Sequence, residues 1–141
     1  MRKHYMLPLL LSMLLLSACS KDVLKSYDKR VLGTWKISDI DRFGLNGADA
    51  LPFKENDLLT FSEDGALTYQ QENKTAQGSW DIQRLTTEDD SKKALQITAI
   101  DFSNQQVRSE YFNDMTFTNT NRFTAFIEYN TLMYVYRFVR Q

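Results

Sequence analysis

Histidine and cysteine are almost absent from this sequence of 141 residues, which has one of each. Both, His4 and Cys19, lie within the first 20 residues, ahead of the part that we expect to fold. The rest of the chain therefore lacks the imidazole of a Ser-His-Asp relay or of a histidine zinc site. It also lacks the thiol of a cysteine nucleophile or an iron–sulfur centre, and a single cysteine forms no internal disulfide. We therefore expect no enzyme, no metal site and no cofactor.

An excess of positive charge is missing too. The formal net charge of the chain is −1. Without its first 18 residues, which carry Arg2 and Lys3, 15 basic residues face 18 acidic ones and the balance is −3. Nucleic-acid surfaces need clustered Lys and Arg, so we expect no nucleic-acid partner. A hydrophobic content of 43% excludes wholesale disorder, and the length suits one domain.

The first 20 residues have the layout of a secretory signal. Arg2 and Lys3 give a basic start, and an apolar run over residues 6–16 follows them. This run is shorter than the roughly 20 residues that cross a bilayer, as is typical of a signal peptide. We therefore expect residues 1–18 to be a signal peptide that is removed from the mature protein.

Cys19 directly follows the small residues at the end of this segment, residues 16–18 (Leu-Ser-Ala). The arrangement resembles the lipobox of bacterial lipoproteins, in which the cysteine becomes the new N-terminus and carries acyl chains such as palmitate. The resemblance implies that Cys19 anchors the protein in a membrane of the cell envelope. Ser20 implies the outer membrane, on either face. Residues 19–29 then form a lipidated N-terminus and polar tether ending in a helical turn; an ordinary signal peptide with a chance cysteine is the alternative.

Beyond the tether, β-branched and aromatic runs alternate with turn signals about every eight to twelve residues, which is typical of an all-β sandwich or barrel. Tight connections force neighbouring strands to pair antiparallel, and such a sheet removes its exposed edges by closing on itself. For residues 30–141 we predict an all-β, antiparallel up-and-down meander that closes into a barrel of about eight strands, in preference to a sandwich. The predicted strands are 31–42, 58–62, 66–71, 78–84, 94–101, 107–112, 115–119, 122–129 and 132–139.

The predicted connections rest on residues that favour turns. Asp64-Gly65 is the clearest hairpin signal, because this dipeptide lies between two apolar runs. Asn113-Asp114 predicts a further turn between two strands. Two longer loops are expected, an irregular one over residues 43–56 and a charged, exposed one over residues 85–92.

Three short motifs of the predicted domain resemble lipocalins, and more closely the small lipocalin-like lipoproteins of bacterial envelopes. They are Leu32-Gly33-Thr34-Trp35 on the first strand, Phe61-Ser62-Glu63-Asp64-Gly65 at a hairpin, and Gly78-Ser79-Trp80 on a later strand. The ending Tyr-Arg-Phe-Val-Arg-Gln over residues 136–141 also fits. The resemblance covers the layout of the whole predicted domain, although few residues carry it.

The resemblance implies a structural closure at one end of the barrel. Trp35 would fill the base of the barrel and stack under an arginine of the last strand, which is Arg140 by its alternation, with Arg137 as the second choice. A cation over an indole ring stabilises a fold by about 0.5–2 kcal/mol. The loop 43–56 would act as a lid at the other end. The domain is short for a lipocalin, so the resemblance leaves a small or filled interior.

Aromatic residues crowd the last quarter of the chain and are the candidates for a ligand pocket. Phe126, Tyr134, Tyr136 and Phe138 would line an apolar pocket, with the tyrosine hydroxyls as polar handles. The alternative is a packed core with tyrosines at its rim.

Two classes of function follow. The first is a non-enzymatic, lipid-anchored envelope lipoprotein that binds or carries a small apolar or amphipathic ligand in a lipocalin-like barrel. The second is a filled barrel that binds an envelope protein, as an inhibitor or accessory subunit. A weaker third option, an enzyme working on tyrosines and carboxylates such as Asp39, Asp41 and Glu128, requires two carboxylates that meet in a cleft.

Overall fold

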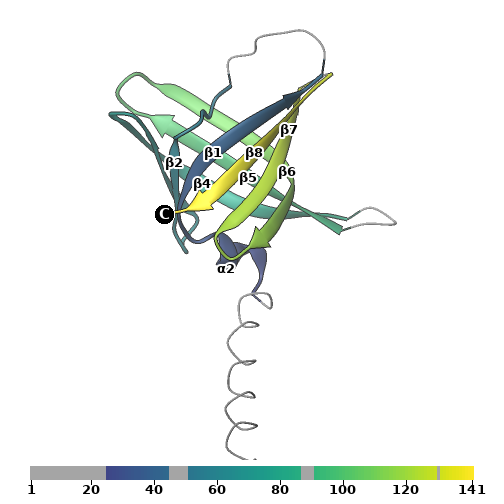
Figure 1. Cartoon of the computed structure of the whole chain (residues 1–141). Coiled ribbons are helices and arrows are strands. Elements are labelled where there is room, and N and C mark those ends of the chain that lie inside the picture. Colours follow the sequence, from purple (N-terminus) through teal and green to yellow (C-terminus); the bar gives the residue numbers. More distant parts are fainter. Residues whose placement is uncertain (1–24, 45–50, 87–90, 130) are drawn as a thin grey trace, which may run out of the picture.

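Residues 25–44, 51–86, 91–129 and 131–141 are described by the computed structural model of this chain. Within them, one short helix is followed by eight strands that form a closed barrel in chain order, β1 pairing with β8 (Figure 1). The predicted all-β, antiparallel up-and-down barrel is therefore confirmed. Its elements are α2 (Tyr27–Val31), β1 (Gly33–Phe43), β2 (Leu58–Phe61), β3 (Ala66–Gln71), β4 (Lys74–Thr86), β5 (Ser91–Asp101), β6 (Gln106–Asn119), β7 (Arg122–Tyr129) and β8 (Leu132–Arg140).

The two ends of the barrel differ. We call the base the end at which β1 begins and β8 ends, where Trp35 pairs with Arg140 and Ile37 with Phe138. Helix α2 lies at this end, and the described chain starts there (Figure 1). We call the mouth the opposite end, which carries the β1–β2 connection. The N-terminal side of the chain and the mouth are thus at opposite ends of the barrel.

Strand alternation fills the barrel interior with apolar side chains, because successive residues of a strand point to opposite faces. On β7 the inward residues are Phe123, Ala125 and Ile127, all at most 3% exposed. The rings of Phe123 and Phe138 stack with centroids 4.2 Å apart. Other rings continue the contacts toward the mouth, since Phe112 meets Tyr136 at 5.0 Å and Phe138 at 5.7 Å. Aromatic packing therefore runs along the length of the barrel.

The turn predicted at Asn113-Asp114 is wrong. Residues 106–119 form a single strand, β6, and the pairing with β7 shifts between Asn113 and Thr116. Asp114 has a φ of 46°, so the chain makes a local bulge there and then continues. The two strands predicted on either side of this turn are one strand with a kink.

Two other boundaries differ from the prediction. The loop expected over residues 85–92 is shorter, because β4 and β5 continue to pair through Leu85 and Lys92 and through Thr86 and Ser91. Residues 87–90 lie outside the described residues. Val31, predicted as the start of the first strand, is instead the last residue of α2. The helical turn expected at the end of the tether is this five-residue helix.

Candidate functional site

Trp35 closes the base of the barrel. Its side chain is fully buried, and its indole nitrogen donates a hydrogen bond of 2.6 Å to the carbonyl oxygen of Val31. The guanidinium carbon of Arg140 lies 4.3 Å from the centre of the indole ring. Arg140 also donates to the carbonyl oxygens of Leu32, at 2.6 Å, and Arg30, at 2.7 Å. The arginine therefore joins the end of β8 to the segment that enters β1.

Gly33 makes room for this contact. Its φ of 106° lies in the region that favours glycine, and an added Cβ would stand 2.9 Å from Nη1 of Arg140. Arg137, the second choice for the stacking arginine, lies instead on the outer face of the barrel. There it pairs with Asp39 and Asp41. These two carboxylates therefore hold an exposed arginine and do not meet in a cleft.

At the mouth, residues 51–57 fold across the barrel, and we call this segment the mouth strap. Phe53 of the strap is fully buried. Its ring lies 5.2 Å from that of Tyr69 and 5.9 Å from that of Phe112. The hydroxyl of Tyr136 donates to the carbonyl oxygen of Phe53 at 3.2 Å. The strap thus places an aromatic plug in the mouth; the other part of the expected lid, residues 45–50, lies outside the described residues.

Asp57 fastens the strap. This carboxylate is 3% exposed, and one of its oxygens accepts hydrogen bonds from the hydroxyl of Tyr69, at 2.6 Å, and the backbone nitrogen of Lys54, at 2.7 Å. Arg108 donates to the same tyrosine oxygen, at 3.0 Å, and to the carbonyl oxygen of Pro52, at 2.8 Å. We call these contacts the strap latch. They join the strap to β3 and β6.

Burial raises the pKa of Asp57, and the hydrogen bonds from Tyr69 and Lys54 only partly oppose this. The folded protein then holds a proton on Asp57 more tightly than the unfolded chain does. The contribution of Asp57 to stability is therefore fully present below the ordinary pKa of 3.8 and is lost as the pH rises through the raised pKa. Above that pH, the buried charge is held by the latch.

A first prediction concerns this pH dependence. In the Asp57→Asn variant, the free energy of unfolding is expected to fall less steeply with rising pH in the acidic range than in the wild type, because the variant lacks the titrating group. Chemical denaturation at a series of pH values measures both profiles. Burial also raises the pKa of Glu110, so the variant keeps a part of the slope. Parallel profiles for the two proteins would contradict the burial of a titrating Asp57.

Glu110 is a second carboxylate of the mouth half of the barrel. It lies on β6 in phase with Arg108 and Phe112, and it is partly buried. Its carboxylate accepts a hydrogen bond from the hydroxyl of Tyr129. Burial raises the pKa of Tyr136 well above its usual range, and the nearby charge of Glu110 adds to this. Polar groups therefore lie above the aromatic interior, toward the mouth.

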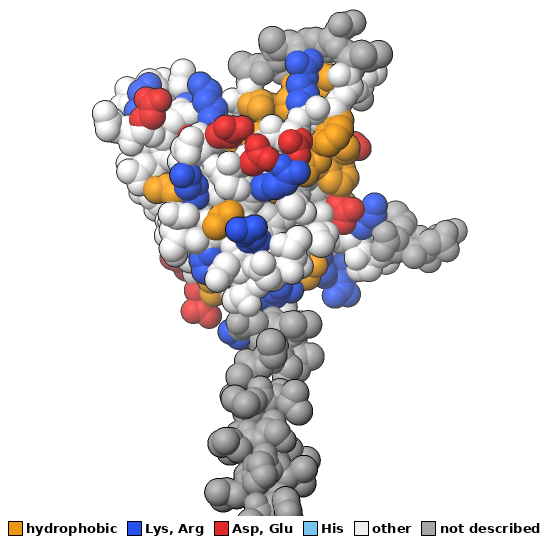
Figure 2. All heavy atoms as spheres, viewed as in Figure 1, with side chains coloured by type: hydrophobic (Ala, Val, Ile, Leu, Met, Phe, Trp, Pro, Cys, Tyr) orange, Lys and Arg blue, Asp and Glu red, His pale blue; other side chains and the backbone are white. Residues whose placement is uncertain are grey.

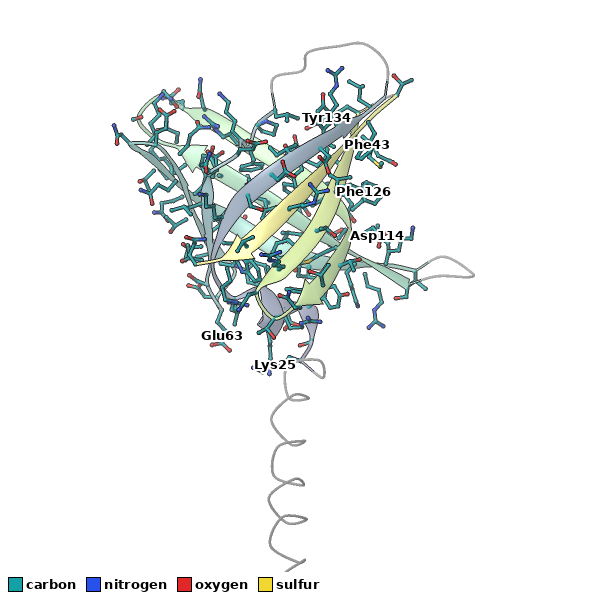
Figure 3. The ribbon with its side chains drawn as sticks, in the orientation of Figure 1. Lys25, Phe43, Glu63, Asp114, Phe126 and Tyr134 are labelled. Carbon is teal, nitrogen blue, oxygen red and sulfur yellow. The ribbon has the colours of Figure 1, made fainter. Side chains whose placement is uncertain are left out.

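The structure separates the four residues predicted to line a ligand pocket. Tyr134, Tyr136 and Phe138 are at most 3% exposed and alternate along β8 on its inner face. Phe126 is out of phase with Phe123, Ala125 and Ile127, and so it lies on the outer face of β7 (Figure 3). The prediction of Phe126 as a lining residue is wrong, because the register of β7 points Phe123, Ala125 and Ile127 inward and therefore Phe126 outward.

Two surface depressions of about 370 Å³ each lie outside the barrel interior. One runs beside the mouth strap, between residues 54–58 and 70–72. The other lies over the outer residues of β1, β7 and β8, near Ser38 and Arg137. The interior itself is occupied by the rings described above, and Phe53 holds the place at its mouth.

The described part of the chain holds no group of three or more His, Cys, Asp or Glu residues arranged to bind a metal ion. In the same residues, no helix has the length and apolar character needed to cross a membrane. No family model, curated protein or solved structure matches this chain.

Proposed function

We propose that this chain is a non-enzymatic lipoprotein of the cell envelope whose lipocalin-like barrel binds a small apolar or amphipathic molecule at its mouth. One observation carries the proposal: Phe53, which comes from a connection rather than from the sheet, is fully buried among Tyr69, Phe112 and the end of Tyr136. The mouth strap is the segment that we expect to move away from the barrel when a ligand binds. An apolar ligand would take the place of the Phe53 ring.

The free energy lost by exposing the Phe53 ring is similar to the free energy gained by burying a ligand of similar apolar surface. Burying an aromatic side chain contributes about 1.5–3 kcal/mol, at roughly 25 cal/mol per Å² of apolar surface. A ligand that displaces the Phe53 ring recovers this burial with its own surface. The inward Arg108 and Glu110 and the tyrosine hydroxyls give an amphipathic ligand partners for its polar end. The strap latch is what such a ligand has to open.

Binding is tested with a fluorescent fatty acid and the Phe53→Ala variant. The wild type is expected to bind the probe saturably, and Phe53→Ala to bind it about 10- to 100-fold more tightly, because the ring no longer competes. Phe126→Ala is the matched control, since it removes the same side chain from the outer face. Its affinity should equal that of the wild type. A wild type without saturable binding would overturn the carrier function.

A second function is favoured by a different observation. At the mouth end, on the β5–β6 hairpin, Phe102 is 74% exposed and Val107 is 62% exposed, while the interior is filled. Exposed apolar side chains at a loop tip are typical of protein-binding surfaces. We propose this hairpin as the contact to an envelope protein if the barrel takes no ligand.

A photo-crosslinker at position 102 tests this proposal, and one at Asn73 of the β3–β4 turn is the control. We expect one discrete crosslinked adduct from position 102, and we expect Val107→Asp to abolish it.

The proposed anchor gives a further prediction. Cys19→Ser should move the protein from the membrane fraction to the soluble fraction of its host, because the acyl chains supply about 0.8 kcal/mol per buried methylene. Fractionation followed by immunoblotting measures this. Ser17→Thr, outside the acylated position, is a control for expression. Unchanged membrane association of Cys19→Ser would defeat the proposed lipid anchor.

A further inference from the structure

A basic depression of about 200 Å³ lies at the base of the barrel. Figure 2 shows Lys and Arg side chains gathered at this end, around α2. The depression is built by three segments that meet there: α2 with its flanking residues, the β6–β7 turn, and the last residue of β8. Its lining residues are Lys25, Lys29, Arg30, Leu32, Thr120 and Arg140.

The two arginines are held in place by the fold. The guanidinium carbon of Arg30 lies 4.0 Å from the ring centre of Phe117 and 5.8 Å from that of Tyr27. Aromatic faces orient a guanidinium without cancelling its formal charge. Arg140 lies over the ring of Trp35 and donates a hydrogen bond to the carbonyl oxygen of Leu32, which also lines the depression. The fold therefore presets the two arginine side chains of the depression.

Among the residues that the structure describes, the acidic ones near the base do not line this depression. Helix α2 contains Asp28 besides Lys29 and Arg30, so its net charge is +1. A hydrogen bond from Ser26 is the main cause that lowers the pKa of Asp28. Glu63, on the β2–β3 turn, lies toward the same end of the molecule but outside the depression (Figure 3). The lining residues therefore carry a net positive formal charge, although the domain as a whole is acidic.

The chain connects this depression to the proposed anchor. Five residues lie between Cys19 and Lys25. Fully extended, the six steps from Cys19 to Lys25 span at most about 22 Å, at 3.3–3.6 Å per residue. A lipid on Cys19 would therefore keep the base of the barrel within about 22 Å of the bilayer. At that distance, the tether gives the depression a high effective concentration of lipid headgroups.

We propose that the basic depression at the base binds the phosphate of an anionic lipid headgroup in the membrane that holds the anchor. The inference rests on the lipid anchor of the proposed function. Bound in this way, the base faces the bilayer and the mouth faces away from it. The mouth strap and the exposed β5–β6 hairpin are then presented to the solvent.

The test compares two Lys→Glu variants that carry the same net charge. Lys29→Glu removes positive charge from the depression, and Lys74→Glu does so at the mouth end, at the start of β4. Both are made in the full chain with Cys19→Ser, so that acyl chains take no part. Co-sedimentation measures the partition of each protein onto phosphatidylcholine vesicles with and without phosphatidylglycerol. The ratio of the two partition coefficients measures the preference for anionic vesicles. The parent and both variants share the first 18 residues, with Arg2 and Lys3, so the change in this ratio from parent to variant excludes their contribution.

The parent chain should prefer the anionic vesicles, and Lys29→Glu should reduce this preference by about 30-fold, because two units of charge change near an anionic surface. Lys74→Glu should keep the preference. Equal binding to both vesicle types, or equal losses in the two variants, would overturn the headgroup site. Inorganic phosphate at matched ionic strength should leave the preference unchanged; displacement by it would show a site for free phosphate instead.

The vesicle experiment can reject the headgroup site without rejecting the lipid anchor. The anchor is judged by where Cys19→Ser fractionates in the host, whereas the depression is judged by vesicle selectivity in a chain that already lacks the cysteine. A soluble Cys19→Ser protein without vesicle selectivity would retain the proposed function and reject the headgroup site.

Discussion

Replacing Trp35 with alanine is expected to lower the free energy of unfolding by about 3–5 kcal/mol, the range for deleting a large buried aromatic side chain. The indole is fully buried and packs edge-on against Phe123, with centroids 4.7 Å apart. Its removal leaves a cavity at the base and takes away the ring beneath Arg140. It also leaves the carbonyl of Val31 without the indole hydrogen bond. Chemical denaturation gives the change directly.

Trp80 provides the matched control for this prediction. It belongs to the second Gly-x-Trp motif, is only partly buried, and donates from its indole to the carbonyl oxygen of Ser62 at 2.9 Å. Trp80→Ala should therefore cost clearly less stability than Trp35→Ala. Trp35→Phe, which keeps a ring under Arg140, should restore a large share of the loss. A denaturation midpoint of Trp35→Ala close to that of the wild type would contradict the closure of the base by this residue.

The barrel was predictable because its signals are local. Alternation places Trp35 and Ile37 on one face of β1, and both are fully buried. Asp64-Gly65 marks the β2–β3 turn, where Gly65 has a φ of 82°. Tight connections of this kind force the antiparallel order, and the order leads to closure. A period of two and well-placed turn residues were enough to reach the topology.

The bulge of β6 was not predictable from the same signals. Asn113-Asp114 has the composition of a turn, and Asp114 does adopt a positive φ. The chain nevertheless continues, because β5 on one side and β7 on the other pair with the two halves of one long strand. Local preference correctly indicated the backbone conformation of Asp114. Pairing with distant strands decided that the conformation makes a kink instead of a reversal.

The mouth half of the site was missed for a related reason. Asp57, Arg108 and Glu110 are charged residues, which sequence patterns place on the surface because an unpaired buried charge is costly. Here each has a partner from another strand or from the strap, such as the hydroxyl of Tyr69 for Asp57. The phase of Arg108 and Glu110 with Phe112 was the available signal. All three residues lie within the predicted strand 107–112, so the alternation was visible in the sequence, but their charge argued against an inward face.

Gly78→Ala is expected to destabilise the fold by about 3 kcal/mol or more, beyond the usual 1–3 kcal/mol of an overpacked site. An added Cβ at Gly78 would stand 1.7 Å from the carbonyl oxygen of Thr98 and 2.8 Å from the Cα of Ala99. Both are backbone atoms of β5, so no side-chain rotation relieves the clash. Gly78 pairs with Ala99, and the two strands would have to separate at this point.

Gly65→Ala distinguishes this steric effect from the general cost of replacing a glycine. At Gly65 the nearest atom to an added Cβ is the carbonyl oxygen of Trp80, at 3.7 Å, which is an ordinary contact. Its penalty comes only from the positive φ and should be about 1–2 kcal/mol. Thermal or chemical denaturation of the two variants should therefore show the larger loss for Gly78→Ala. If Gly78→Ala were as stable as Gly65→Ala, the close approach of β4 and β5 at Gly78 would be wrong.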